Sequence, residues 1–142
     1  ENFKLAPGAA AFLDFLKENN IPMTIATMSE WDNVEFYIKE FKLAKWFDVD
    51  KIVYSNGKIP GKPAPDIFLI AAGKIGLNPK DCVVFEDAIA GINAAKAAGI
   101  GKIIAVDSIE PIEFYRDIDG LSGIITSFDE VDKSMFEIPS VI

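Results

Sequence analysis

The stretch VVFEDAIAGINAAKAAG, from Val83 to Gly99, decides the fold of this chain. It begins as a short apolar run, which is typical of a strand buried on both faces. Two adjacent carboxylates, Glu86 and Asp87, follow that run at once, and the alanine-rich remainder predicts a helix over residues 90–98. A buried strand that leads through charged residues into a helix is typical of an α/β protein.

The same alternation of strands and helices runs along the rest of the chain. Strands are predicted at IPMTIAT (residues 21–27), KIVYS (51–55), CVVFE (82–86), KIIAV (102–106) and GIIT (123–126). Other helices are predicted from Pro7 onward, from Ser29 to about Phe41, from Pro65 to about Ile75 and, briefly, after Ser127. The pattern predicts a single domain over residues 1–142, built as a doubly wound, Rossmann-like parallel sheet with helices on both faces.

Composition excludes several classes of function. The net charge of −8 argues against nucleic acid or an anionic membrane as a partner. No apolar run reaches the roughly 18 residues that a membrane span needs. The chain has no histidine, which excludes Ser-His and Cys-His catalysis and leaves a hard, oxygen-bound ion such as Mg²⁺ as the expected metal. The single cysteine, Cys82, is interpreted as a small core residue, and the location that we expect is the cytoplasm.

In parallel sheets, ligands bind at the carboxyl ends of the strands, so the residues after each strand are the candidates for chemistry. Thr27 offers a hydroxyl where its strand ends, and the amides of Met28 and Ser29 lead into a helix N-terminus that favours an anion. The alternative is that Ser29 only caps that helix and Thr27 is only a strand residue.

A lysine in a stiff loop is the second candidate. Lys62 lies in GKPAPD, where Pro63 and Pro65 restrict the backbone and hold the ammonium in one direction. A fixed ammonium suits a phosphate or a carboxylate. The alternative is a solvated surface lysine, which is what we expect of the nearby Lys58.

The acid pair is the third candidate. Glu86 and Asp87 repel each other unless a positive group joins them, and Mg²⁺ binds carboxylate oxygens. One acid could instead cap the following helix, but that accounts less well for two. A hydroxyl, a lysine and paired acids, each after its own strand or in the loop beyond it, predict a phosphoryl-transfer site.

Three of these stretches resemble the haloacid dehalogenase superfamily of phosphatases and phosphomutases. TIATMS is similar to the second motif of that family, GKPAPDIF to the third and VVFEDAIAGINAAKAAG to the fourth; the resemblance covers roughly residues 5–106. The form EDAIAGI is similar to the β-phosphoglucomutase-like branch, although Ala88 stands where many relatives have serine.

The resemblance implies a role for each candidate residue. Thr27 and Lys62 become catalytic, phosphate-binding groups, with the Met28 and Ser29 amides beside them. Asp87 becomes a ligand of Mg²⁺, and Glu86 becomes a ligand of the ion either directly or through a water molecule. The substrate implied is a small phosphorylated metabolite.

The first motif of the family, a strand followed by Asp-x-Asp-Gly-Thr, is not found in the 142 residues, and neither is the cap that selects the substrate. The nearest matches are Asp48–Asp50 and Asp117–Asp119, and neither follows a buried strand. The chain begins with Glu1 rather than Met. We therefore expect the nucleophilic aspartate to come from an N-terminal segment of the same protein that precedes this sequence.

Two other functions compete with that of an enzyme fragment. One is a catalytically inactive phosphate-binding or interaction module that has lost its nucleophile. The other is a two-component receiver domain, which also combines Lys-Pro with an acid pair, but in the reverse order along the chain.

The family's nucleophile strand lies between the strand ending at Thr27 and the strand ending at Phe85. The core should therefore be incomplete without this central strand. We expect the MTIAT and CVVFE strands to lie about 10 Å apart, one strand's width, without direct hydrogen bonds between them. That space should be filled, most simply by the preceding segment.

Overall fold

Strands and helices alternate along the chain in the computed structural model, which describes residues 5–107 and 112–136. The strands are β1 (Ala26–Glu30), β2 (Val53–Ser55), β3 (Val83–Glu86), β4 (Lys102–Val106) and β5 (Gly123–Ile125). The helices are α1 (Ala9–Glu18), α2 (Trp31–Glu40), α3 (Asp66–Lys74), α4 (Ile89–Ala97) and α5 (Ile112–Arg116), and short 3₁₀ turns lie in several connections. The predicted α/β class is confirmed.

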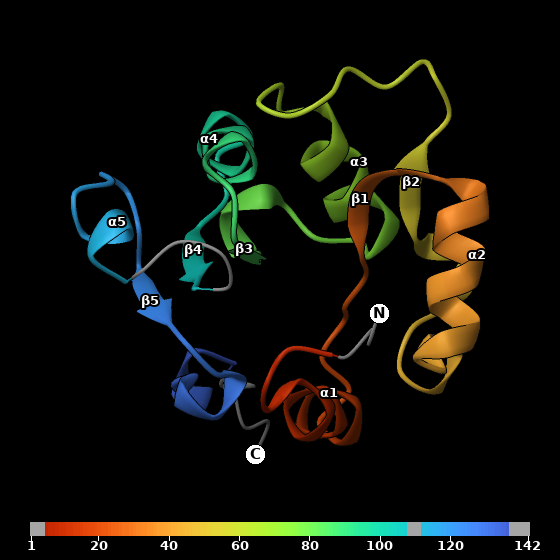
Figure 1. Cartoon of the computed structure of the whole chain (residues 1–142), viewed down its shortest axis with the longest axis horizontal. Coiled ribbons are helices and arrows are strands. Elements are labelled where there is room, and N and C mark those ends of the chain that lie inside the picture. Colours follow the sequence, from red (N-terminus) through yellow and green to blue (C-terminus); the bar gives the residue numbers. More distant parts are fainter. Residues whose placement is uncertain (1–4, 108–111, 137–142) are drawn as a thin grey trace.

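The strands form two parallel groups (Figure 1). β1 pairs with β2, and β3, β4 and β5 form a second sheet in that order. Within the described residues no ladder joins β1 to β3, as the sequence predicted. The edges of β1 and β3 that face away from their partners therefore lack a neighbouring strand among these residues.

Helices cover both faces of the strands. Along β4 the side chains alternate, so that Ile103 and Ala105 pack into a core with α3, α4 and α5, while Ile104 and Val106 pack into a core with α1. A third core lies around α2 and includes Trp46. α3 packs on β1 and β2 and also on α4, which packs on β3, so these two helices link the two sheets.

The predicted strand over residues 21–27 is wrong in its bounds. Residues 21–25 are not assigned to a strand, and β1 instead continues from Ala26 to Glu30. Residues 21–25 are tied to the β2 side by the Val53 N–H, which donates to the Ile25 carbonyl at 2.9 Å, and by the Thr24 hydroxyl. On the side facing β3 no described strand is paired with them, so a regular ladder does not form.

The prediction that Ser29 caps the next helix is also wrong. Ser29 lies within β1, α2 begins at Trp31, and Glu30 occupies the N-cap without a side-chain cap bond. Glu30 still pairs with Ser55 of β2, so the strand continues past Thr27, where the sequence pattern predicted its end. The register of this pairing shifts between Ala26 and Glu30.

Most other predicted elements agree with the structure within a residue or two. Gly99 follows α4 with φ 77°, as expected of a C′ glycine. Ser127 and Glu130 form the expected capping box, on a 3₁₀ turn over Phe128–Glu130. The sequence analysis missed α5. Among the described residues no helix is long and apolar enough to cross a membrane.

Candidate active site

Lys62 links the first residue of β1 to the carboxyl end of β3. Its Nζ lies 2.8 Å from Glu86 Oε2 and also donates to the carbonyl of Ala26 at 3.4 Å. The ammonium lies 5.0 Å from the centre of the Phe68 ring, within cation–π range. With side chains 17% and 12% exposed, Lys62 and Glu86 form a largely desolvated ion pair. Removing either partner would leave an uncompensated charge.

The acid pair lies at the end of β3. The other carboxylate oxygen of Glu86 accepts a hydrogen bond from the Asp87 N–H at 3.2 Å. The Glu86 side chain lies against Gly91 of α4, where an added Cβ would be only 2.0 Å from the carboxyl carbon. Glycine at position 91 therefore gives the carboxylate room to reach Lys62.

The predicted phosphate-binding residues Thr27, Met28 and Ser29 lie within β1. The Thr27 hydroxyl accepts a hydrogen bond from the Ser29 N–H at 3.1 Å, so two of the predicted groups contact each other. Met28 packs partly against the core that includes α3 and α4. Thr27 directly follows Ala26, whose carbonyl contacts Lys62.

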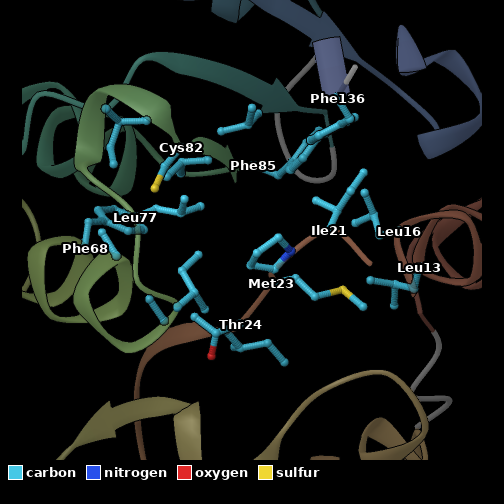
Figure 2. Close-up of a pocket in the computed structure, with 18 of the residues that line it drawn as sticks. Leu13, Leu16, Ile21, Met23, Thr24, Phe68, Leu77, Cys82, Phe85 and Phe136 are labelled. Carbon is cyan, nitrogen blue, oxygen red and sulfur yellow. The ribbon is translucent and has the colours of Figure 1, made fainter. Parts of the chain in front are cut away.

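An apolar cavity of about 610 Å³, here called the central slot, lies between β1 and β3 (Figure 2). Residues 21–26 and residues 81–86 form its two walls. Helix α1 and aromatic side chains near the C-terminus close one side, and α3 closes the other. The chief side chains of these closing elements are Phe12, Leu16, Phe68, Ala72, Phe128 and Phe136. The lining includes Ala26 and Glu86, both of which contact Lys62. One end of the slot therefore reaches the candidate site.

Cys82 lines the central slot and is only partly buried, so its interpretation as a core residue is correct only in part. Burial raises the pKa of its thiol, and the neighbouring Asp81 carboxylate adds to the rise. A thiol with a raised pKa is a poor nucleophile at neutral pH.

The structure thus brings Lys62, Glu86 and the backbone beside Thr27 into contact, with Asp87 next to Glu86. Lys58 is exposed, as expected. Asp48 caps a 3₁₀ turn that precedes β2, at the opposite end of that strand from the site.

Two residues that the sequence analysis did not single out also contact the acid pair. Gly91 is one; a glycine inside an alanine-rich helix is a signal of close packing that could have revealed it. Tyr115 is the other, and its hydroxyl bonds the Asp87 backbone carbonyl from 28 residues away. No local pattern marks such a contact.

Comparison with known proteins gives a consistent result. A family model described as "haloacid dehalogenase-like hydrolase" matches residues 1–99. A "Probable pseudouridine-5'-phosphatase" of Drosophila melanogaster is 41% identical over 98% of this chain, and a β-phosphoglucomutase of Bacillus subtilis is 41% identical over 68% of it. The crystal structure of a HAD hydrolase of family IA, variant 3, from Entamoeba histolytica superposes with a TM-score of 0.91, at 40% identity over 95% of this chain.

The chain spans only part of each of these proteins. It covers 61% of the length of the Drosophila protein, 41% of the Bacillus mutase and 60% of the Entamoeba chain.

Proposed function

Because the chain belongs to the haloacid dehalogenase-like hydrolases, we propose that it forms the phosphate-binding core of a magnesium-dependent phosphatase or phosphomutase. The observation that carries the proposal is the Lys62 ammonium, held between the carbonyl of Ala26, the first residue of β1, and the carboxylate of Glu86 at the carboxyl end of β3. The proposed substrate is a small, sugar-phosphate-like metabolite, which the names of the relatives support, and the proposed location is the cytoplasm.

The chain's own residues would bind the phosphoryl group. The Thr27 oxygen already accepts the Ser29 N–H, so its own proton is available to a phosphate oxygen. Lys62 would turn from Glu86 toward the phosphate and neutralise part of its charge. Met28 and Ser29 follow Thr27 within β1, and their amides would add donors, that of Ser29 after leaving the Thr27 hydroxyl.

Glu86 and Asp87 are the right donors for Mg²⁺, because that ion prefers carboxylate oxygens. They supply only part of an octahedral shell, and the described residues contain no group of three acidic or sulfur side chains that could hold a metal. When bound, Mg²⁺ would neutralise charge on the transferred phosphoryl group. We propose that further ligands come from outside these 142 residues.

The same reasoning gives a role to the central slot. We propose that a preceding segment of the protein enters it as a strand parallel to β1 and β3. The apolar lining supports this, and so do the edges of both strands, which have no partner strand among the described residues and would be costly to leave open. A parallel strand would end at the same rim as β3, where it would deliver a nucleophilic aspartate beside Lys62.

The test is to express the chain with the segment that precedes Glu1 in its gene, hereafter the parent protein. We expect the parent to hydrolyse an aryl phosphate in the presence of Mg²⁺ and the 142-residue chain to have no such activity. Asp87→Ala in the parent should remove the activity. A parent that binds phosphate but gives no turnover would contradict the enzyme proposal.

That outcome would favour the second candidate, a phosphate-binding or interaction module without catalysis. The observation behind it is that neither Asp-x-Asp match of the chain directly follows a strand: Asp48 precedes β2, and Asp117 follows α5.

A further inference from the structure

Tyr115 of α5 is fully buried, with 0% of the residue exposed. Its hydroxyl donates a hydrogen bond to the carbonyl of Asp87 at 2.8 Å. Because a buried hydroxyl is costly unless it is hydrogen-bonded, the two groups constrain each other's positions. The contact brings an element near the C-terminus onto the turn that carries the acid pair.

The turn that carries the acid pair leads from β3 into α4. Ala88 is the N-cap of α4 and has no side-chain oxygen to bond the first free N–H groups of the helix. Its carbonyl accepts the Ile92 N–H at 3.0 Å, which fixes the helix side of the turn. On the strand side the Asp87 N–H bonds Glu86, a side chain that is shared with Lys62.

We propose that Tyr115 is a positioning residue for the Asp87 carboxylate. The carbonyl of Asp87 fixes the peptide plane that follows its Cα, so a bond to that carbonyl restricts the backbone from which the carboxylate projects. The Tyr115 hydroxyl thereby holds the proposed metal ligand in one orientation without touching substrate or metal. The inference rests on the proposed function in one respect, namely that Asp87 is a metal ligand.

Tyr115→Phe tests the proposal, because it keeps the ring in the core and removes only the hydroxyl. In the parent protein, we expect the Mg²⁺ concentration for half-maximal hydrolysis of an aryl phosphate to rise about 3- to 10-fold, the range that loss of one hydrogen bond allows. The KM for the aryl phosphate at saturating Mg²⁺ should stay within about twofold, since Thr27 and Lys62 are unaffected.

Tyr54→Phe is the matched control. Tyr54 lies in β2, and among the described residues its hydroxyl makes no hydrogen bond, while its ring contacts Trp31. This variant should leave the Mg²⁺ requirement unchanged. The positioning role is wrong if Tyr115→Phe also leaves the Mg²⁺ requirement unchanged. It is also wrong if Tyr115→Phe weakens the binding of Mg²⁺ and of the aryl phosphate equally.

Amide hydrogen exchange in the 142-residue chain, without metal, separates this inference from the proposed function. Tyr115→Phe should accelerate exchange at Asp87 and Ala88 several-fold while exchange in β4 stays the same. Unchanged exchange at both amides overturns the inference, whatever the parent's activity. Accelerated exchange with an inactive parent overturns the proposed function and leaves Tyr115 as the residue that orders this turn.

Discussion

Gly91 is the residue on which the Lys62–Glu86 ion pair depends most directly. A methyl group there would overlap the Glu86 carboxyl, which has little freedom to move because Lys62 holds it. Gly73 of α3 is its counterpart in a helix interior, and a Cβ at Gly73 would meet nothing within 4 Å. Alanine substitutions at the two glycines therefore separate the effect of helix propensity on stability from the effect of packing at the site.

We predict that Gly73→Ala raises the free energy of unfolding by about 0.5–1 kcal/mol, the ordinary gain from glycine to alanine in a helix. Gly91→Ala should instead lower it by about 1 kcal/mol, because overpacking outweighs that gain. Urea denaturation of both variants measures the difference. When Glu86 is also replaced by alanine, Gly91→Ala should no longer lower the free energy of unfolding. If Gly91→Ala still lowers it, Glu86 is not the cause of the destabilisation.

Asp87 and Lys58 are expected to differ sharply in their effect on catalysis. Asp87→Asn removes a full negative charge from the proposed metal site and weakens metal binding there. Loss of the bound metal would cost several kcal/mol of transition-state stabilisation. We predict a fall in kcat of the parent protein by about 100-fold or more. Lys58→Ala, at an exposed position, should stay within about twofold. Equal losses in steady-state assays would mean that the site has been assigned to the wrong side chains.

At the scale of elements, the capping box after β5 ties the end of the chain to its beginning. Glu130 accepts hydrogen bonds from the Thr126 hydroxyl and from the Ser127 N–H, and the Ser127 hydroxyl donates to the carbonyl of Pro7, which precedes α1. The hydrogen bond from the Thr126 hydroxyl is the largest cause of the lowered pKa of Glu130. Bonds from Ser134 likewise lower the pKa of Asp132.

These lowered pKa values predict a pH dependence. Since the folded state holds the Glu130 pKa below its ordinary 4.5, the unfolded state binds the proton more readily. The contribution of Glu130 to stability is present above its unfolded-state pKa of about 4.5 and is lost as the pH falls through the lower folded-state pKa. Glu130→Gln should therefore flatten the fall in unfolding free energy below about pH 4.5. Acid titrations of stability check this; an unaltered slope would contradict it.

At the scale of the whole molecule, the central slot is an apolar opening between two sheets that α3 and α4 hold in place. We predict that the 142-residue chain binds the dye anilinonaphthalene sulfonate with enhanced fluorescence, as accessible apolar surface does. The parent protein should lose this fluorescence, because the proposed preceding strand would fill the slot. Equal dye binding by both proteins would mean that the strand does not enter.

Metal binding should depend on the same completion. Two carboxylates supply too little of the shell of Mg²⁺, and Glu86 is already paired with Lys62. Calorimetry on the 142-residue chain should therefore detect no magnesium affinity in the micromolar range. Micromolar affinity would show that the chain holds the ion without ligands from another segment.

Local sequence patterns were enough to predict the α/β class, the strand at residues 102–106, the glycine that ends α4 and the family of the chain. These follow from local signals: apolar runs, turn residues and motif spacing, each contained within a few neighbouring positions. The order of Thr27, Lys62 and the acid pair also predicted which residues to examine, because the carboxyl ends of parallel strands share one edge.

Tertiary packing, and no local pattern, sets where β1 begins and ends, how Lys62 pairs with Glu86, and that Tyr115 bonds the Asp87 carbonyl. The physical reason is that each depends on partners distant in the sequence. A strand's bounds are set by the neighbour that accepts its hydrogen bonds, and residues 21–25 face the central slot instead of such a neighbour. Side-chain contacts such as that of Tyr115 arise only when helices and sheets pack together.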